Sequence, residues 1–426
     1  MVLKFSFNRF VKLLTILLTI SYVGILAGYK ACTLLALFLI LSFIIGIILK
    51  HIKSVSKNRT IFLWKCFFVY LCFNGILSFP RSVFYLVLLG AGILIMSRKT
   101  TCPEIKSIVS FFKIFAIILS ISIYIQAFLP NLFYPFAERW FYYSSQFELI
   151  YNMGIVNHQY SGIFYEVSQA SFILSIGCFI CFIEGYFKRE KRVWNYAFFL
   201  IMYFAIVLTG KRSTTLIVAF LILLFWSINN LRKITLWKIL GVLLVVMVVL
   251  LQIDNIMIII NMLLTKGHES IYLSGREKFW QLAIDLFNHS PIFGTGINSY
   301  DVYFNNAGIR SIKYDFAGAH NSYLQMLAET GTIGIVLFML ALFSTMKLSI
   351  MRALEFTRTT AVNKTIYCNV AMLEIFFIAA YSLSENPIYM PQQLITLFLF
   401  IGFLINLRPD DEYSEGKNIV SDRMET

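Results

Sequence analysis

Charged residues are scarce in this sequence, and acidic residues are scarcer than basic ones. Only 14% of the 426 residues are charged, whereas 59% are hydrophobic and the mean hydropathy is +0.76. Soluble domains average about 25% charged and about 45–50% apolar residues. The composition therefore excludes an ordinary soluble domain and predicts an all-α protein that crosses a membrane many times.

Motifs for nucleotides, metals and disulfides are also missing. The sequence contains no P-loop and no dinucleotide fingerprint, and its long polar loops hold no acidic pair that resembles a metal site. His268, His289 and His320 are not at metal-ligand spacing. Cys178 and Cys181 have redox-motif spacing, but they lie inside an apolar run, where packing explains them. No cofactor or metal is expected, so an energy source for chemistry has to arrive with the substrate.

Apolar runs make up most of the chain. A membrane-spanning helix needs about 20 mainly apolar residues, with a range of roughly 17–25. About twelve runs qualify, and we expect them to form one transmembrane domain over residues 1–408, followed by a disordered cytoplasmic tail over 409–426. The runs lie near residues 13–28, 31–49, 61–79, 82–97, 107–129, 168–187, 193–210, 212–229, 238–262, 323–346, 365–384 and 390–407.

The distribution of Lys and Arg predicts which connections face the cytoplasm. Cytoplasmic loops carry an excess of basic residues, and most of the 36 Lys and Arg residues lie in alternate connections when both termini are cytoplasmic. The net charge of +14 follows from this orientation and does not argue for nucleic acid as a partner. Two longer loops, near residues 130–167 and 263–322, then face away from the cytoplasm.

The first of these outer loops is rich in aromatic residues and ends at an acidic one. Side chains such as Phe133, Tyr134 and Phe136 fit an interfacial layer or a surface on which sugars stack. An ordinary aromatic belt at the membrane surface is the simpler interpretation. Glu166 stands at the outer mouth of the next span, which makes it a candidate base.

A short outer connection, Thr209-Gly-Lys-Arg-Ser-Thr214, places two positive charges where the charge rule disfavours them. Arg212 also stands at a helix N-terminus, where the helix dipole is already positive. An anion bound by Lys211, Arg212 and the helix end would resolve the conflict. The alternatives are a surface exception to the charge rule or a salt bridge to Glu166.

The second outer loop begins with an amphipathic pattern. Apolar residues recur on one side from Phe279 to Phe287, and Pro291 ends the pattern. Because the apolar side includes a Trp and two Phe, we expect this helix to lie in the membrane interface. Farther along, His320-Asn-Ser opens the helix that becomes the next span.

Arg212, Arg276, His320 and Glu166 all face the same side in this topology. Two arginines can hold a diphosphate through paired, charge-assisted hydrogen bonds, and a histidine can accept a proton near neutral pH. A lipid-linked diphosphate sugar fits this set, because it is anionic, membrane-borne and activated at its anomeric carbon. A helix cap or a packed core residue is the alternative role for His320.

Several segments, taken in order, resemble the O-antigen polymerase and O-antigen ligase superfamily. The segments are Thr209-Gly-Lys-Arg212, Gly275-Arg276…Trp280, Pro291-Ile-Phe-Gly-Thr-Gly296, His320-Asn-Ser-Tyr-Leu324 and Glu329-Thr-Gly331. The resemblance implies a multi-span, GT-C-like glycosyltransferase that inverts configuration and needs no metal. It also implies that Arg212 and Arg276, with Lys211 beside them, bind the diphosphate and that His320 activates the acceptor hydroxyl.

The same resemblance implies the substrates and the location. Donor and acceptor would be glycans linked to undecaprenyl diphosphate, at the outer face of the bacterial inner membrane. The expected partners are these glycans, membrane lipid and, as a candidate, a chain-length regulator.

Polymerase and ligase are both open at this point. Gly162-Ile-Phe-Tyr-Glu166 looks like a segment common in polymerases, in which a Pro often follows the Glu, although Val167 stands here. We favour a polymerase that joins repeat units into an O-antigen or capsular-type polysaccharide. A ligase that transfers the finished glycan to lipid A-core is the alternative. A transporter or flippase is a third function, but the sequence shows no clear repeat and its polar residues gather at one face.

Overall fold

A computed structural model of the chain describes residues 58–98, 100–140, 144–164, 166–229, 276–306, 318–357 and 361–407. Within these ranges the architecture is helical. The α-helices are α3 (Arg59–Asn74), α4 (Ser82–Ser97), α5 (Cys102–Phe128), α6 (Pro130–Trp140), α7 (Ser144–Ile155), α8 (Val167–Phe187), α9 (Arg192–Leu208), α10 (Arg212–Asn229), α12 (Glu277–His289), α13 (Tyr300–Asn306), α14 (Ser322–Thr357), α15 (Val362–Tyr381) and α16 (Pro391–Asn406). The short 3₁₀ turns η2 (Gly75–Ser78) and η3 (Arg189–Lys191) precede α4 and α9.

The described helices confirm a multi-pass membrane protein. Seven are long and apolar enough to span a membrane, and α4 and α16 are shorter apolar helices. These nine helices coincide with nine of the predicted runs. The other three runs, near 13–28, 31–49 and 238–262, lie outside the described residues. The predicted tail over 409–426 also lies outside them.

α8 and α15 form the interior of the bundle. About four-fifths of the apolar part of α8 is buried (78%), and α15 is similar (72%), whereas α9 is mostly exposed (22% buried). Lipid is as apolar as a leucine side chain, so helices in a membrane associate through close packing rather than through hydrophobic burial. Phe377 of α15 provides such packing, with ring centroids 6.2 Å from Phe172 and 6.0 Å from Phe179 of α8.

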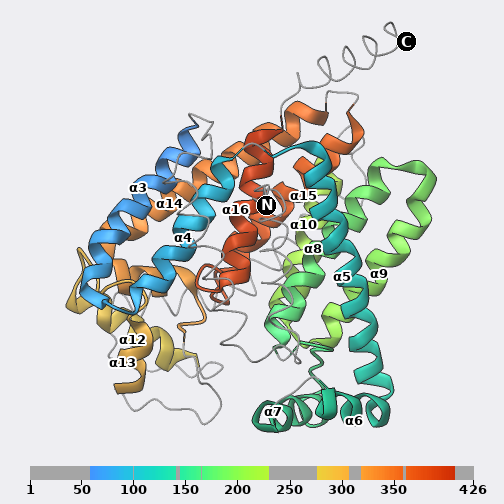
Figure 1. The fold of residues 1–426 in the computed structure, drawn as a ribbon, viewed down its shortest axis with the longest axis horizontal. Coiled ribbons are helices and arrows are strands. Elements are labelled where there is room, and N and C mark those ends of the chain that lie inside the picture. The colour runs from blue at the N-terminus through green and yellow to red at the C-terminus, as the bar shows by residue number, and fades with distance from the viewer. Residues whose placement is uncertain are drawn as a thin grey trace, which may run out of the picture.

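The longer loops are folded at one end of the bundle. Figure 1 shows α6 and α7 lying crosswise at the end of α5, and α12 and α13 at the same end of the molecule. Both predicted outer loops therefore contain helices, and these helices lie at the end of the bundle at which α8, α10, α14 and α16 begin (Figure 1).

Two glycines let the loop after α12 pack directly on α14. Gly331 interrupts α14 with φ +62°, and Gly294 in the loop has φ +72°, a backbone region that favours glycine. A Cβ atom on Gly331 would lie 2.4 Å from the carbonyl oxygen of Ile292, and one on Gly294 would lie 2.3 Å from the carbonyl carbon of Glu329. Backbone therefore meets backbone here, and neither position has room for a side chain.

A buried carboxylate fixes the same contact. Glu329 is fully buried and accepts hydrogen bonds from the backbone N–H groups of Asn298 (2.8 Å) and Tyr300 (3.0 Å) and from the Gln325 side chain (3.2 Å). A carboxylate removed from water needs such donors. The Tyr300 hydroxyl in turn donates to the carbonyl of Phe279 at 2.6 Å. Glu329 thereby fixes α13 and α12 against α14.

Asn74, at the end of α3, holds the loop from the other side. Its amide donates to the carbonyl of Phe293 at 2.7 Å and accepts from the N–H of Ile297 at 2.7 Å. The Ser78 hydroxyl donates to the Ile297 carbonyl at 2.6 Å. The loop between α12 and α13 is therefore positioned by α3 as well as by α14.

The amphipathic helix predicted after residue 274 is present as α12, but its predicted environment is wrong. Phe279 and Trp280, on its apolar side, are buried in a small core with Tyr300 of α13 and Leu324 of α14. The apolar side therefore faces protein and not the membrane interface. The periodicity identified the buried side of this helix correctly, but it could not identify what covers that side.

Replacing Gly331 with Ala should destabilise the protein by about 2 kcal/mol or more, because a strained left-handed residue alone costs about 1–3 kcal/mol. Thermal unfolding of the purified protein in detergent measures the change. Gly90→Ala is the matched control: its Cβ atom would meet only the Phe68 ring, at 3.4 Å, inside a regular helix. Equal unfolding temperatures for the two variants would show that the Gly331 contact does not matter.

Candidate active site

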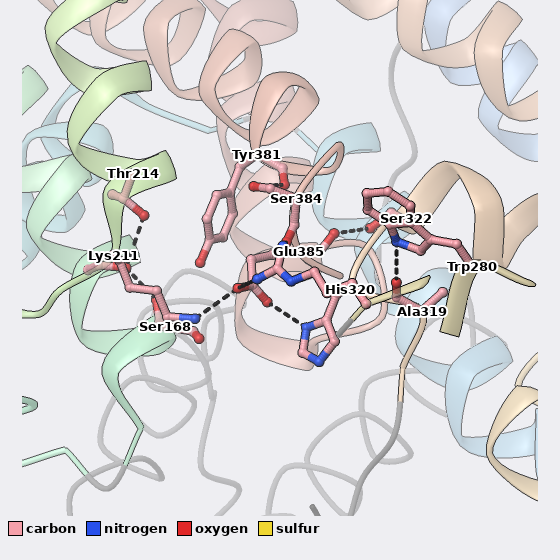
Figure 2. A network of polar contacts seen from close by, with 12 residues as sticks. Ser168, Lys211, Thr214, Trp280, Ala319, His320, Ser322, Tyr381, Ser384 and Glu385 are labelled. Carbon is pink, nitrogen blue, oxygen red and sulfur yellow. Dashed lines mark hydrogen bonds and ion pairs between the residues drawn. The ribbon is translucent and has the colours of Figure 1, made fainter. Parts of the chain in front are cut away.

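Glu385 is the centre of a cluster of charged side chains at the end of the bundle where α6 and α12 lie. It stands in the turn between α15 and α16 and is only 8% exposed. Its Oε1 atom lies 2.8 Å from Lys211 Nζ and 3.6 Å from Arg276 Nη2, and its Oε2 atom lies 3.2 Å from His320 Nδ1. Figure 2 shows Lys211 and His320 reaching the carboxylate from opposite sides. Three segments that are distant in sequence thus meet on one carboxylate.

The turn that carries Glu385 also holds the start of α14. The N–H of Ser322 donates to the carbonyl oxygens of Ser382 (2.8 Å) and Glu385 (3.2 Å), and the Ser322 hydroxyl donates to the Glu385 carbonyl (3.2 Å). These bonds satisfy donors that a helix leaves unpaired in its first turn. The start of α14, and with it His320, is fixed relative to Glu385.

The turn between α9 and α10 directs Lys211 into the cluster. Gly210 there has φ +70° and packs against the side chain of Gln159. The Lys211 N–H donates to the Thr209 hydroxyl at 3.3 Å, and the Lys211 side chain reaches Glu385. Arg212 is the first residue of α10; its side chain is exposed and makes no ion pair with any described residue.

Arg276 joins the cluster from the beginning of α12. Its Nη1 atom donates to the carbonyl oxygen of Ser384 at 2.9 Å, while Nη2 faces the carboxylate of the next residue, Glu385. About a third of the Arg276 side chain is exposed. The turn after α15 thus orients the guanidinium, and part of the Arg276 side chain remains accessible from outside the cluster.

His320 is held in an uncommon backbone conformation. Its φ is +49°, which is rare for residues other than glycine. The preceding residue, Ala319, accepts a hydrogen bond from Trp280 Nε1 at 3.0 Å and donates one to Gln325 at 3.1 Å, and all three are buried. The Asn321 side chain accepts from the first amides of α14. The backbone on both sides of His320 is therefore fixed.

The carboxylate contact assigns different roles to the two nitrogens of the His320 ring. A carboxylate at Nδ1 favours the tautomer with the proton on that nitrogen, and the lone pair is then on Nε2. The second ring nitrogen points away from Glu385 (Figure 2). Phe279 packs edge-to-face against the ring, with centroids 5.6 Å apart. The imidazole is thus oriented in the way that a general base requires.

The carboxyl group at the centre of the cluster, Glu385, and the one near it, Glu166, have opposite pKa shifts. Burial alone would raise the pKa of Glu385, but Lys211, His320 and Arg276 hold it well below its usual range. Burial raises the pKa of Glu166, against the opposing charges of Lys211 and His320 and with the added effect of Glu385. Glu385 therefore stays ionised, whereas Glu166 takes up a proton more readily than an ordinary carboxylate.

The arrangement is suited to binding an anion and transferring a proton. It offers a lysine, an arginine and a carboxylate-oriented histidine, with a second carboxyl group close by. Among the residues that the structure describes, no three His, Cys, Asp or Glu side chains are grouped so as to hold a metal ion.

The structure brings together Lys211, Arg276 and His320 from the predicted set and places Glu166 near them. Arg212 lies beside Lys211 but outside the ion-pair cluster, and the salt-bridge partner of Lys211 is Glu385 rather than Glu166. Sequence reasoning missed Glu385. The available signal was a carboxylate in the short connection Ser384–Pro391, which the predicted topology places on the same side of the membrane as the other candidates.

Residues 196–339 match a protein-family model described as O-Antigen ligase. The matched range runs from α9 to α14 and includes Lys211, Arg276 and His320, whereas Glu166 and Glu385 lie outside it. None of the curated proteins matches the chain.

Glu385→Gln should lower the free energy of unfolding by about 2 kcal/mol or more, because removing one member of a buried ion cluster leaves the others uncompensated. The matched control is Glu355→Gln, which removes an exposed partner of Arg352 and should change stability by less than about 1 kcal/mol. Chemical or thermal unfolding in detergent distinguishes the two. Similar small changes for both variants would mean that the cluster contributes little to folding.

Proposed function

We propose that this member of the O-antigen ligase and polymerase superfamily is a glycosyltransferase that joins glycan repeat units carried on a lipid diphosphate. The observation that carries the proposal is the meeting of Lys211, Arg276 and His320 on Glu385. Such a cluster supplies both parts that the reaction needs: cations for a diphosphate and an oriented base for a hydroxyl group.

The donor diphosphate would bind between Arg276 and the turn that carries Lys211 and Arg212. Arginine matches two phosphate oxygens at once with its planar fork. The N-terminus of α10 adds amide donors and the positive end of a helix dipole, which favour an anion. These groups would also stabilise the negative charge that develops on the diphosphate as it leaves the sugar.

His320 would activate the acceptor. Its Nε2 atom takes the proton of the acceptor hydroxyl while that oxygen attacks the anomeric carbon of the donor sugar. The bond between the anomeric carbon and the diphosphate oxygen breaks, and its electron pair leaves with the diphosphate. Attack from the face opposite the leaving group inverts the configuration at the anomeric carbon. Glu385 stabilises the imidazolium that forms, and Glu166 is the second candidate for the proton acceptor.

The orientation follows from the distribution of basic residues. We place both termini in the cytoplasm and the site at the outer face of the bacterial inner membrane, where undecaprenyl-diphosphate glycans are the expected substrates. The described polar cluster lies at one end of the helices rather than near their middle, which supports a transferase over a transporter.

Two acceptors distinguish the two candidate functions within the family. A polymerase adds the growing glycan to another lipid-linked repeat unit, and we favour this function because of the segment Gly162–Glu166. A ligase transfers the finished glycan to lipid A-core, and the description of the matched family model favours that function.

Purified protein in lipid vesicles, supplied only with lipid-linked repeat units, should form long glycan chains, resolved by gel electrophoresis. Chelation with EDTA should leave the rate unchanged, because the proposed chemistry uses no metal. Product that appears only after lipid A-core is added would identify a ligase. No new glycosidic bond with either acceptor would refute the proposal.

His320→Ala should lower turnover by about 10²–10⁴-fold, the usual contribution of a positioned base. Donor binding should persist, because the basic side chains carry the diphosphate affinity. His289→Ala is the control: that histidine is exposed at the end of α12 and should leave turnover unchanged.

Glu166→Gln tests the other assignment of the base. If Glu166 is the base, it becomes protonated and inactive as the pH falls through its raised pKa, which produces an acid limb in the pH–rate profile. If His320 is the base, the acid limb persists in Glu166→Gln. An inactive Glu166→Gln variant together with a nearly active His320→Ala variant would assign the proton transfer to the carboxylate.

A further inference from the structure

The surface of α6 is divided into distinct sides. Leu132 and Phe136, with Leu129 just before the helix, form an apolar row that is 65%, 51% and 54% exposed, respectively. Asn131 and Glu138 are exposed on another side of the same helix. Residues three, four and seven positions apart share one face of a helix, so each set forms a stripe. The exposed surface of α6 is therefore amphipathic, with Arg139, seven residues after Leu132, exposed beside the apolar row in the last turn.

The remaining side of α6 already has a partner. Phe133, Tyr134 and Ala137 pack with Ile150 of α7 in a small core of their own. A Cβ atom on Gly154 of α7 would clash with the Tyr134 hydroxyl, so the two helices approach closely there. This small core holds the hairpin of α6 and α7 together.

The apolar row continues the lipid-facing surface of α5. Ile114, Ile118, Ile121 and Phe128 are 58%, 50%, 52% and 69% exposed, and their spacing places them on one side of this membrane-spanning helix. Leu129 follows directly at the end of α5, where α6 turns across the helix end (Figure 1). The exposed apolar residues of the span and those of α6 thus adjoin at Phe128 and Leu129.

We propose that α6 lies on the lipid surface at the site's side of the membrane. In this position Leu129, Leu132 and Phe136 insert at the boundary between headgroups and acyl chains, while Asn131 and Glu138 face water. An amphipathic helix with large apolar side chains on one side and polar residues on the other binds a lipid surface in this way. The proposal does not depend on the proposed function.

The lipid-bound hairpin is connected to the segment that leads to Glu166. The side chain of Gln126, fully buried near the end of α5, donates to the Tyr134 hydroxyl at 3.3 Å and accepts from the N–H of Gly162 at 2.7 Å. The Ser122 hydroxyl accepts from the N–H of Ile163 at 3.1 Å. The depth of α6 in the lipid surface therefore also sets the position, along the membrane normal, of the segment before Glu166.

Spin labels test the position of α6. Single cysteines at Leu132, Phe136, Asn131 and Glu138, in a variant without the seven native cysteines, carry nitroxides in protein reconstituted into phospholipid vesicles. Labels at 132 and 136 should collide more with oxygen, which concentrates in lipid, than with a water-soluble nickel chelate. Labels at 131 and 138 should show the reverse. Equal access to the nickel chelate at all four sites, as for a glycan-binding surface in water, would overturn the proposal. Protection of 132 and 136 from both reagents, as in a protein interface, would overturn it as well.

Photocrosslinking repeats the test with the native cysteines in place, in case their removal prevents folding. Benzoylphenylalanine at position 132 should form adducts with phospholipid, detected by mass spectrometry, and the same group at position 138 should not. Gel filtration of both variants shows that they are folded. Lipid adducts at both positions or at neither would contradict the proposed orientation.

Discussion

A buried carboxylate held by basic side chains organises this end of the molecule. Glu385 takes ion-pair or hydrogen-bond partners from the α9–α10 turn, from the start of α12 and from the residues before α14. A charge that is removed from water is tolerated only when its partners are well placed. Each of these segments connects membrane-spanning helices or lies between them. The ion pairs that compensate the charge of Glu385 therefore hold these segments in one arrangement relative to one another. The pairing also determines which nitrogen of His320 can act as a base.

A second layer of contacts makes that arrangement rigid. Glu329 and the two glycines at 294 and 331 bring the loop after α12 into backbone contact with α14. Trp280 and Gln325 then hold the peptide groups next to His320, whose positive φ would otherwise be unfavourable. The strained residue is thus supported by groups that do not touch the charged cluster. This separation is typical of sites in which reactive groups are positioned in advance.

The sequence was sufficient to predict the described membrane-spanning helices and the meeting of several candidate residues at one end of them, because apolar run length and the order of the connections report on those features directly. It could not predict the pairing within the cluster. Glu385 lies in a short connection that resembles any other, and its partners depend on the order in which helices pack. Lys211 and Arg212 are adjacent, and only the folded turn shows that Lys211 pairs with Glu385 while Arg212 is exposed. For α12, periodicity identified the apolar side but not the protein surface that covers it.

The length of α16 has a consequence for where in the membrane the charged cluster lies. With 16 residues, this helix is about 24 Å long, shorter than a hydrocarbon layer of about 30 Å. Because α16 is buried among other helices, it does not have to match the thickness of the lipid. The turn before it, which carries Glu385, can therefore lie below the plane of the headgroups. At that depth, the proposed lipid-linked substrate would meet the cations without rising out of the bilayer, and the length of its glycan would not alter its reach.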